Sequence, residues 1–190
     1  MKVVAFNGSP RNDGNTAAMI RHIFSVLEPE GIECELIQLG GNIVRGCRAC
    51  GKCKEMKNGK CVFNDDMMNE WIEKMIEADG IIIGAPTYFA SINAETKAFI
   101  DRAGYVSRAN GNLFKRKTGV AVVAARRAGF LNVFQTINNF FLIMEMIVPG
   151  SIYWNLSVAR DKGDFEKDEE GVRTMEALGV NMAWLLKKLN

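Results

Sequence analysis

The chain has 190 residues, a length typical of one domain, and 48% of them are apolar, enough for a hydrophobic core. Its formal net charge of +2 is too small to indicate a nucleic-acid partner. The apolar run that follows Lys2 is too short for a signal-peptide core, and the later stretch 140–148 is far below the length of a membrane span, so we expect no membrane association and a cytoplasmic location. Thiols stay reduced in that compartment, which favours metal or redox chemistry over structural disulfides for clustered cysteines.

Apolar runs of strand length alternate with segments of helical periodicity along the whole chain. The sequence predicts strands at 2–9, 33–40, 81–88, 117–126 and 151–158. It predicts helices at 15–30, 65–80, 94–104, 130–148 and 169–189. This alternation favours an α/β three-layer sandwich in one domain (1–190), with a five-stranded parallel sheet covered on both faces. In the doubly wound order 2-1-3-4-5, ligands bind at the loops after the first, third and fourth strands.

The segment GSPRNDGNT (8–16) joins the first predicted strand to the first predicted helix. Its glycines relax the backbone, and its polar side chains lie beside the free amides of a helix N-terminus. Arg11 adds a positive charge, so the segment favours binding of a phosphate group. A plain turn with a helix cap is the alternative interpretation. The segment matches neither G-x-x-x-x-G-K-[ST] nor G-x-G-x-x-G, which argues against nucleotide hydrolysis and a dinucleotide fold.

Four of the five cysteines lie in a loop at 43–64 with the spacing C-x2-C-x2-C-x7-C, and they are Cys47, Cys50, Cys53 and Cys61. This compact run is typical of [4Fe–4S] ligation, whereas zinc ribbons use two separate C-x2-C pairs. A cluster, zinc, and free or disulfide-bonded thiols all remain open. Four lysines in the same segment would offset the negative charge of thiolates, namely Lys52, Lys54, Lys57 and Lys60. Cys34, in the second predicted strand, is expected to be a small core residue.

Three segments together connect the chain with a known family: GSPRNDGNT at 8–16, GAPTYFASINAETKAFIDR at 84–102, and the cysteine run followed by DDM at 65–67. The chain resembles the NADPH-dependent FMN reductase and iron–sulfur flavoprotein family, which has the flavodoxin-like fold. The resemblance implies a [4Fe–4S] cluster on the four cysteines, although related reductases keep similar cysteines and need not contain a cluster. It also implies that the FMN phosphate is held by Ser9, Arg11, Asn15 and Thr16.

Two later loops would then lie beside a flavin ring. The resemblance implies that the ring contacts the loop after the third strand, at Pro86, Thr87, Tyr88 and Phe89. These residues can supply an apolar wall and hydrogen bonds, although aromatic residues that merely pack a loop would give the same pattern. The loop AARRAGF (124–130) follows the fourth strand and carries Arg126, Arg127 and Gly129. A guanidinium here would stabilise a reduced flavin or meet a nucleotide phosphate, unless both arginines are simply solvated.

We therefore expect an FMN-binding oxidoreductase that passes electrons between FMN and a [4Fe–4S] cluster, with NAD(P)H or a ferredoxin-type protein as donor. One alternative is an NAD(P)H-dependent FMN or quinone reductase without a cluster. Another is a non-catalytic module that binds a metal or an anion and senses redox state. His22, the only histidine, has no partner in the sequence and is expected to be structural.

The predicted helix 130–148 is apolar on nearly every side. Its main stripe consists of Phe130, Phe134, Ile137, Phe141, Met144 and Val148, and a second set extends onto other faces at Val133, Phe140, Ile143 and Ile147. A helix that covers a sheet in a monomer keeps one broad polar face. We therefore expect a second subunit to cover this helix in a homodimer or homotetramer. The alternative is that the loop 105–116 or the last helix covers it within one chain.

Overall fold

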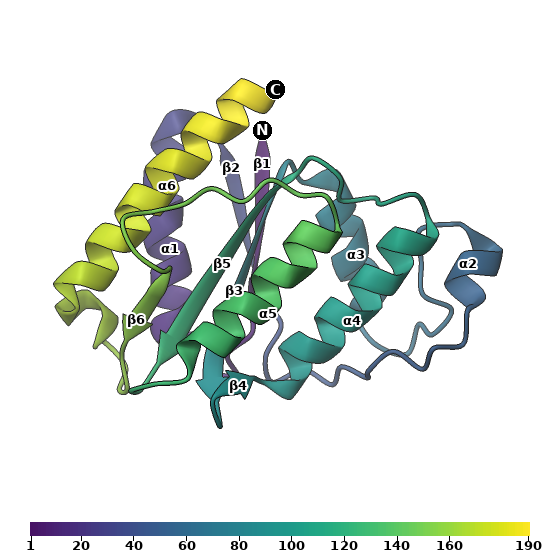
Figure 1. Ribbon diagram of the computed structural model, residues 1–190, viewed down its shortest axis with the longest axis horizontal. Coiled ribbons are helices and arrows are strands. Elements are labelled where there is room, and N and C mark those ends of the chain that lie inside the picture. Colours follow the sequence, from purple (N-terminus) through teal and green to yellow (C-terminus); the bar gives the residue numbers. More distant parts are fainter.

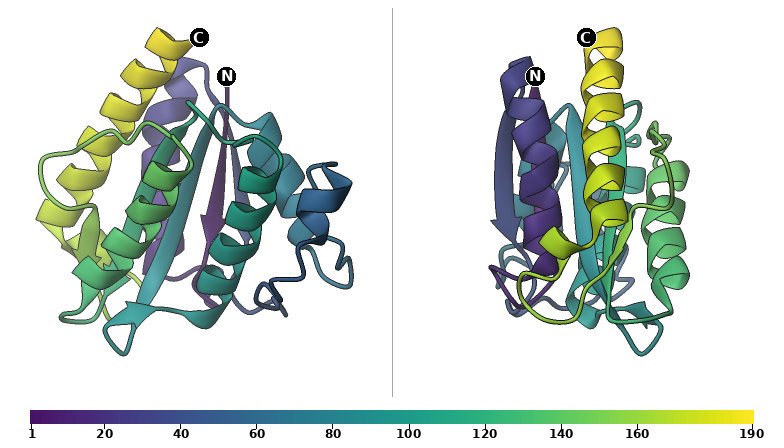
Figure 2. Two further views of the ribbon diagram at one scale, coloured as in Figure 1. Left: turned by 45° about the vertical axis from the view of Figure 1, so that its right-hand side comes forward. Right: turned by 90° about the vertical axis from the view of Figure 1, so that its left-hand side faces the viewer.

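The structure is a computed structural model that describes residues 1–190. A parallel sheet forms its middle layer, and helices cover both faces (Figures 1 and 2). The strands are β1 (Lys2–Asn7), β2 (Glu33–Gln38), β3 (Gly80–Tyr88), β5 (Thr118–Ala125) and β6 (Leu156–Val158). Their order β2-β1-β3-β5-β6 confirms the predicted order 2-1-3-4-5. One short strand was not predicted: β4 (Ser91–Ile92) folds back antiparallel on the end of β3.

The helices divide between the two faces of the sheet. Helix α1 (Asn15–Leu27) packs with α6 (Glu169–Leu189) on one face. The other face carries α3 (Met68–Glu77), α4 (Ala94–Ala109) and α5 (Phe130–Ile143). The remaining helical segments are short: η1 (Glu28–Glu30), α2 (Lys52–Met56) and η2 (Phe165–Lys167). No helix combines the length and the apolar character that a membrane crossing requires.

The sheet separates two hydrophobic cores, which explains why its strands are apolar at nearly every position. Val4 and Phe6 of β1 point into the core under α3, α4 and α5, whereas Val3 and Ala5 point into the core under α1 and α6. Side chains alternate between the two faces of a strand, so a strand covered on both faces needs apolar residues throughout.

Two predicted elements end differently in the structure. The predicted helix 130–148 stops at Ile143, because Glu145 adopts a left-handed backbone conformation with φ 58°. The chain then forms a parallel bridge between Ile147 and Thr118 beside β5. Val148 and Met144 therefore do not continue the helical stripe. The predicted strand 151–158 is ordered as a strand only over Leu156–Val158.

Helix α4 is longer than predicted and continues to Ala109, and α3 begins later, at Met68. The amide of Met68 donates to Oδ1 of Asp66 at 3.2 Å, so the carboxylate of Asp66 satisfies a donor at the start of this helix. The cysteine-rich loop leaves the sheet after β2 and runs past α4 to α2, at the right-hand side of Figure 1. The carboxyl ends of β1, β3 and β5 meet at the lower edge of the sheet in the same view.

Candidate functional site

An anion cradle lies where β1 leads into α1. The helix begins after Gly14, which has no capping side chain, and the amides of Asn15, Thr16 and Ala17 have no hydrogen-bond partner within the chain. Free amides at a helix N-terminus, together with the helix dipole, favour a bound anion. The exposed guanidinium of Arg11 adds positive charge at the same loop. The cradle therefore lies at the position predicted for a phosphate group.

Buried amide side chains fix the shape of this loop. Nδ2 of Asn93 donates to the carbonyl oxygen of Gly8 at 2.8 Å, and Nε2 of Gln38 donates to the carbonyl oxygen of Ser9 at 2.7 Å. Gly40 lies so close behind the loop that a Cβ there would be 2.2 Å from the Gly8 oxygen. Because these partners come from two separate segments, the end of β2 and the start of α4, the loop holds its shape without a ligand.

Sequence reasoning missed this support. The side chain of Asn7, fully buried at the end of β1, accepts from the Ser9 amide at 3.1 Å and donates to Oε1 of Gln38 at 2.7 Å. The only signals in the sequence are a polar residue at the end of an apolar strand and the glycine pair at 40–41. Neither signal identifies a partner far away in the chain.

The four residues predicted to hold a phosphate all lie at the cradle, but three of their side chains have other partners. Nη1 of Arg11 lies 3.5 Å from the carbonyl oxygen of Arg160. The Ser9 hydroxyl accepts from the Arg11 amide at 3.2 Å. The Asn15 side chain donates to the carbonyl oxygen of Asp161 at 2.9 Å and accepts from the amide of Phe165 at 3.3 Å. Asn15 thus offers its backbone amide to an anion, and its side chain ties the cradle to the loop that follows β6.

The loop after β3 places its predicted residues at different depths. Pro86 and Thr87 are half-buried, Tyr88 is partly exposed, and Phe89 is fully exposed at the tip of the β3–β4 hairpin, where its φ is 47°. Phe89 therefore does not form an apolar wall with the other three in this conformation. The Thr87 hydroxyl oxygen is buried without a hydrogen-bond partner, which is costly unless a ligand supplies one.

Gly129 lets the loop after β5 approach the hairpin. Its φ of +85° is a left-handed conformation that favours glycine, and a Cβ there would lie 2.5 Å from the Cα of Ala90. Asn132 adds a hydrogen bond from Nδ2 to the Ala90 carbonyl oxygen at 2.9 Å. Arg126 and Arg127 remain exposed on this loop. The first, second and third predicted loops thus meet at one edge of the sheet.

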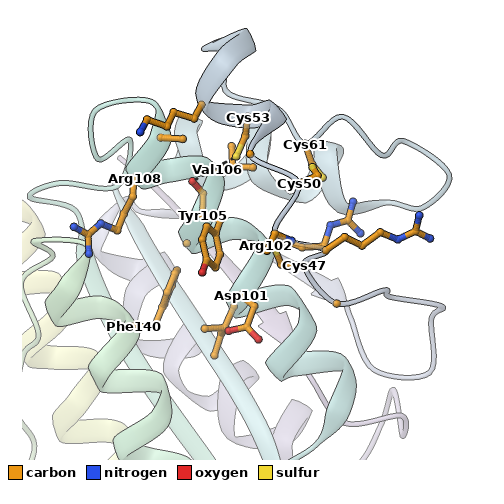
Figure 3. A pocket seen from close by; sticks show the side chains of 18 of the residues that line it. Cys47, Cys50, Cys53, Cys61, Asp101, Arg102, Tyr105, Val106, Arg108 and Phe140 are labelled. Carbon is orange, nitrogen blue, oxygen red and sulfur yellow. Dashed lines mark hydrogen bonds between the residues drawn. The ribbon is translucent and has the colours of Figure 1, made fainter.

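The cysteine-rich loop forms a second candidate site. All four of its cysteines line a cavity of about 940 Å³, which also reaches α4 and α5 (Figure 3). The thiols of Cys47 and Cys50 are exposed, those of Cys53 and Cys61 are half-buried, and all four are free. Asn69 of α3 holds Cys61 in place: its Oδ1 accepts from the Cys61 amide at 2.8 Å, and its Nδ2 donates to the Cys61 carbonyl oxygen at 2.9 Å.

The thiols are neighbours but are not arranged around a common point. Burial raises the pKa of the Cys53 thiol, and negative charge on Cys47 and Cys50 would raise it further. A thiolate at Cys53 is therefore favoured only when a cation lies nearby. No three thiol, carboxylate or imidazole groups converge closely enough to hold a metal ion in this conformation. The donor set itself, four cysteines on the wall of one cavity, fits an iron–sulfur cluster chemically.

A parallel sheet of this order, with an anion cradle after its first strand and two facing loops, defines the flavodoxin-like class of proteins. The sequence pattern that describes NADPH-dependent FMN reductases matches residues 1–161, and the chain belongs to this family. The protein is therefore an FMN-binding, flavodoxin-like oxidoreductase, as the resemblance implied.

Curated relatives extend the comparison to the cysteine-rich loop. An iron–sulfur flavoprotein of Methanocaldococcus jannaschii is 39% identical over 194 residues, which cover 98% of both chains. An iron–sulfur flavoprotein of Methanosarcina thermophila is 34% identical and covers 98% of this chain and 96% of its own. The predicted resemblance to iron–sulfur flavoproteins is thus confirmed.

Solved structures support the fold. RosB with bound 8-demethyl-8-formylriboflavin-5′-phosphate superposes with a TM-score of 0.80 at 18% identity, covering 100% of this chain and 80% of that one. A flavodoxin from the domain Archaea superposes with a TM-score of 0.63 at 16% identity, covering 98% and 99%. At these identities the comparison establishes the flavodoxin-like fold alone.

The fifth cysteine gives a test of the thiol environments. Burial raises the pKa of the Cys34 thiol to about 12 from an ordinary 9.0, and the carboxylates of Glu28 and Glu33 add to this effect. Its thiolate fraction at pH 8 is therefore about a thousandfold below that of an ordinary thiol. In metal-free protein treated with iodoacetamide, peptide mass spectrometry should find Cys50 alkylated and Cys34 protected until denaturant is added. Equal labelling of Cys34 and Cys50 in the folded protein would contradict this picture.

Proposed function

We propose that this oxidoreductase passes electrons between FMN and a [4Fe–4S] cluster, with NAD(P)H or a ferredoxin-type protein as electron donor. The observation that carries the proposal is that one chain has both an anion cradle at the carboxyl edge of the sheet and four free thiols on the wall of one cavity. FMN exchanges two electrons with a hydride donor and a [4Fe–4S] cluster exchanges one at a time, so the pair would connect two-electron and one-electron partners. The names of the curated relatives support the cluster.

At the anion cradle, the chain would bind the FMN phosphate through the backbone amides in the first turn of α1 and the guanidinium of Arg11. The unpartnered hydroxyl of Thr87 would take part in hydrogen bonding to the ring, beside Pro86 and Tyr88. Arg126 would place positive charge near the ring edge, or meet a phosphate of the incoming nucleotide. Gly129 serves the site indirectly, because it allows its loop to approach the hairpin.

At the cavity, Cys47, Cys50, Cys53 and Cys61 would hold the cluster. The four surrounding lysines do not contribute equally to charge balance. Lys52 is paired with Glu55 at 2.7 Å, and Lys60 lies 4.0 Å from Glu73. Lys54 and Lys57 line the cavity itself and form no ion pair with a carboxylate, so their charges remain available to offset those of the thiolates.

We also propose a homodimer or homotetramer in which a second copy covers α5. Leu142 and Ile143 on the outer side of this helix are 62% and 55% exposed, while Ile137 and Phe141 fill the core. The last helix does not cover α5, because α6 lies on the opposite face of the sheet. Ile143 also lines the cysteine cavity, so a subunit that covers this side of α5 would also approach the cavity.

A reductase without a cluster is the second candidate function. The observation that favours it is the lack of any converged group of metal ligands in this conformation. Such an enzyme would oxidise NAD(P)H with FMN or a quinone as acceptor, and the cysteine-rich loop would then be a lid or a thiol switch. A quinone-reducing NAD(P)H dehydrogenase of Trichlorobacter lovleyi is 29% identical over 82 residues, 43% of this chain.

The cradle is tested by filling the space behind it. In Gly40→Ala, the new Cβ would lie 2.2 Å from the Gly8 oxygen and 2.4 Å from the Ser9 carbonyl carbon, so the loop must shift. We expect FMN to bind at least about tenfold more weakly, a loss of ~1.4 kcal/mol, measured by quenching of FMN fluorescence on titration. Gly150→Ala is the matched control, because nothing lies within 4 Å of a Cβ there. Unchanged FMN affinity in Gly40→Ala would argue against the cradle as the phosphate site.

The cluster is tested by anaerobic purification followed by iron and sulfide analysis. We expect about four irons per protomer in the wild type, and a large loss in Cys50→Ser with FMN retained. Cys34→Ser, which lies outside the cavity, should keep its iron. Wild-type protein without iron, together with undiminished NAD(P)H oxidation by Cys50→Ser, would favour the reductase without a cluster.

Assembly is tested by light scattering at micromolar concentration. The expected mass is two or four times the 21.1 kDa of one chain. Ile143→Glu places a charge in the proposed interface and should shift the mass toward that of the monomer. Glu176→Lys, on the exposed side of α6, should leave the mass unchanged. A stable monomer with FMN bound would defeat the proposal of a homo-oligomer.

A further inference from the structure

A buried arginine joins the two ends of the cysteine-rich loop. The side chain of Arg102, on α4, is only 3% exposed and forms an ion pair with the equally buried carboxylate of Asp66. Its Nη2 donates to the carbonyl oxygen of Phe63 at 3.0 Å, and its Nη1 lies 3.4 Å from the carbonyl oxygen of Arg45. Arg45 precedes the first cysteine of the run, and Phe63 and Asp66 follow the last. One guanidinium thus holds both ends of the segment that carries the four thiols.

One N–H donor of this guanidinium has no hydrogen-bond partner. The Nε–H of Arg102 is buried without a hydrogen-bond partner, although the side chain lines the cysteine cavity. An unpaired donor on a buried charged group is costly, and its neighbourhood shows which acceptor would satisfy it. Cys61 lines the same cavity, and Figure 3 shows Cys61 and Arg102 at the same side of it, so the Cys61 sulfur is a suitable acceptor for this donor.

The other cations around the cavity differ from Arg102 in their exposure to solvent. Arg108 and Lys57 line the same cavity but are exposed, so salt screens their charge. Arg48 is also exposed and lies 4.4 Å above the ring of Phe63. Arg102 alone among these is buried, fixed in orientation by three partners, and shielded from solvent. Its charge acts on the cavity in a low-dielectric environment.

We propose that Arg102 is a positioning residue of the metal centre, whose free Nε–H donates to the Cys61 sulfur when the four cysteines are loaded. The inference rests on the proposed cluster function. A hydrogen bond and a fixed positive charge at a ligand sulfur stabilise the more negative, reduced form of a cluster and raise its reduction potential. Arg102 therefore sets the electron affinity of the centre as well as the shape of its loop.

The test uses anaerobically purified holoprotein and the variant Arg102→Lys, which keeps a positive charge opposite Asp66 but has no Nε–H. The midpoint potential of the cluster is measured by redox titration with electron paramagnetic resonance of the reduced state. We expect the reduction equilibrium to weaken about tenfold, a shift of ~59 mV to more negative potential, that persists at high salt. Arg108→Gln, in the same cavity, should leave the potential unchanged at high salt. An unchanged potential in iron-loaded Arg102→Lys would overturn the inference.

The remaining outcomes are also decisive. Iron missing from the wild type would remove the proposed function itself, and this inference with it. If Arg102→Lys folds and binds FMN but loses iron, Asp66→Asn separates the two roles, because it weakens the loop anchor and keeps the Nε–H. Retention of iron by Asp66→Asn would then support the direct role of Arg102. Equal loss of iron, or loss of the fold in Arg102→Lys, would assign the guanidinium to the loop anchor alone and overturn the inference.

Discussion

The close approach of two backbones at the carboxyl edge of the sheet determines the shape of the anion cradle. The Gly8 amide donates to the carbonyl oxygen of Gly84 at 2.7 Å, which continues the pairing of β1 with β3 into the loop. A Cβ at Gly8 would lie 2.1 Å from the hydroxyl oxygen of Thr96 and 2.8 Å from the Gly84 oxygen. Only a glycine fits between α4 and β3 here, and the first loop can therefore turn directly into α1. The free amides of the anion cradle result from this turn.

Helix α4 connects the two candidate sites. At its N-terminal end, Asn93 donates to Gly8, and Thr96 donates to Oδ1 of Asn93 at 2.8 Å, so this end supports the cradle. Nine residues further on, roughly 14 Å along a helix axis, Arg102 holds the cysteine-rich loop. Because one rigid helix carries both sets of contacts, the anion cradle and the thiol cavity keep a fixed position relative to each other within a protomer. The exposed side of α5 beside the cavity is where a second copy would add to this arrangement.

The sequence was sufficient to predict secondary structure and local motifs, but it did not predict contacts between residues far apart in the chain. Strands β1, β3 and β5 were predicted closely, because a strand covered on both faces is an uninterrupted apolar run. The end of α5 was not predicted, because no glycine or asparagine near Glu145 indicates a left-handed residue there. Ile147 is apolar, which fits a buried helix position as well as the β-bridge that it forms. The four residues predicted to hold a phosphate lie together in the loop after β1, yet the partners of the Asn15 side chain lie about 150 residues away. The anchors Asn93 and Arg102 were missed for the same reason: their partners lie 85 and 36 to 57 residues away.

The central claim is that one protomer carries two redox centres, and the most direct measurement is the number of electrons it accepts. Anaerobic titration of the purified holoprotein with dithionite, followed by visible absorbance, counts these electrons. FMN takes two and a [4Fe–4S] cluster takes one, so the account predicts uptake of about three electrons per protomer, with bleaching of both flavin and iron–sulfur bands. Uptake of about two electrons, with flavin bleaching alone, would contradict it.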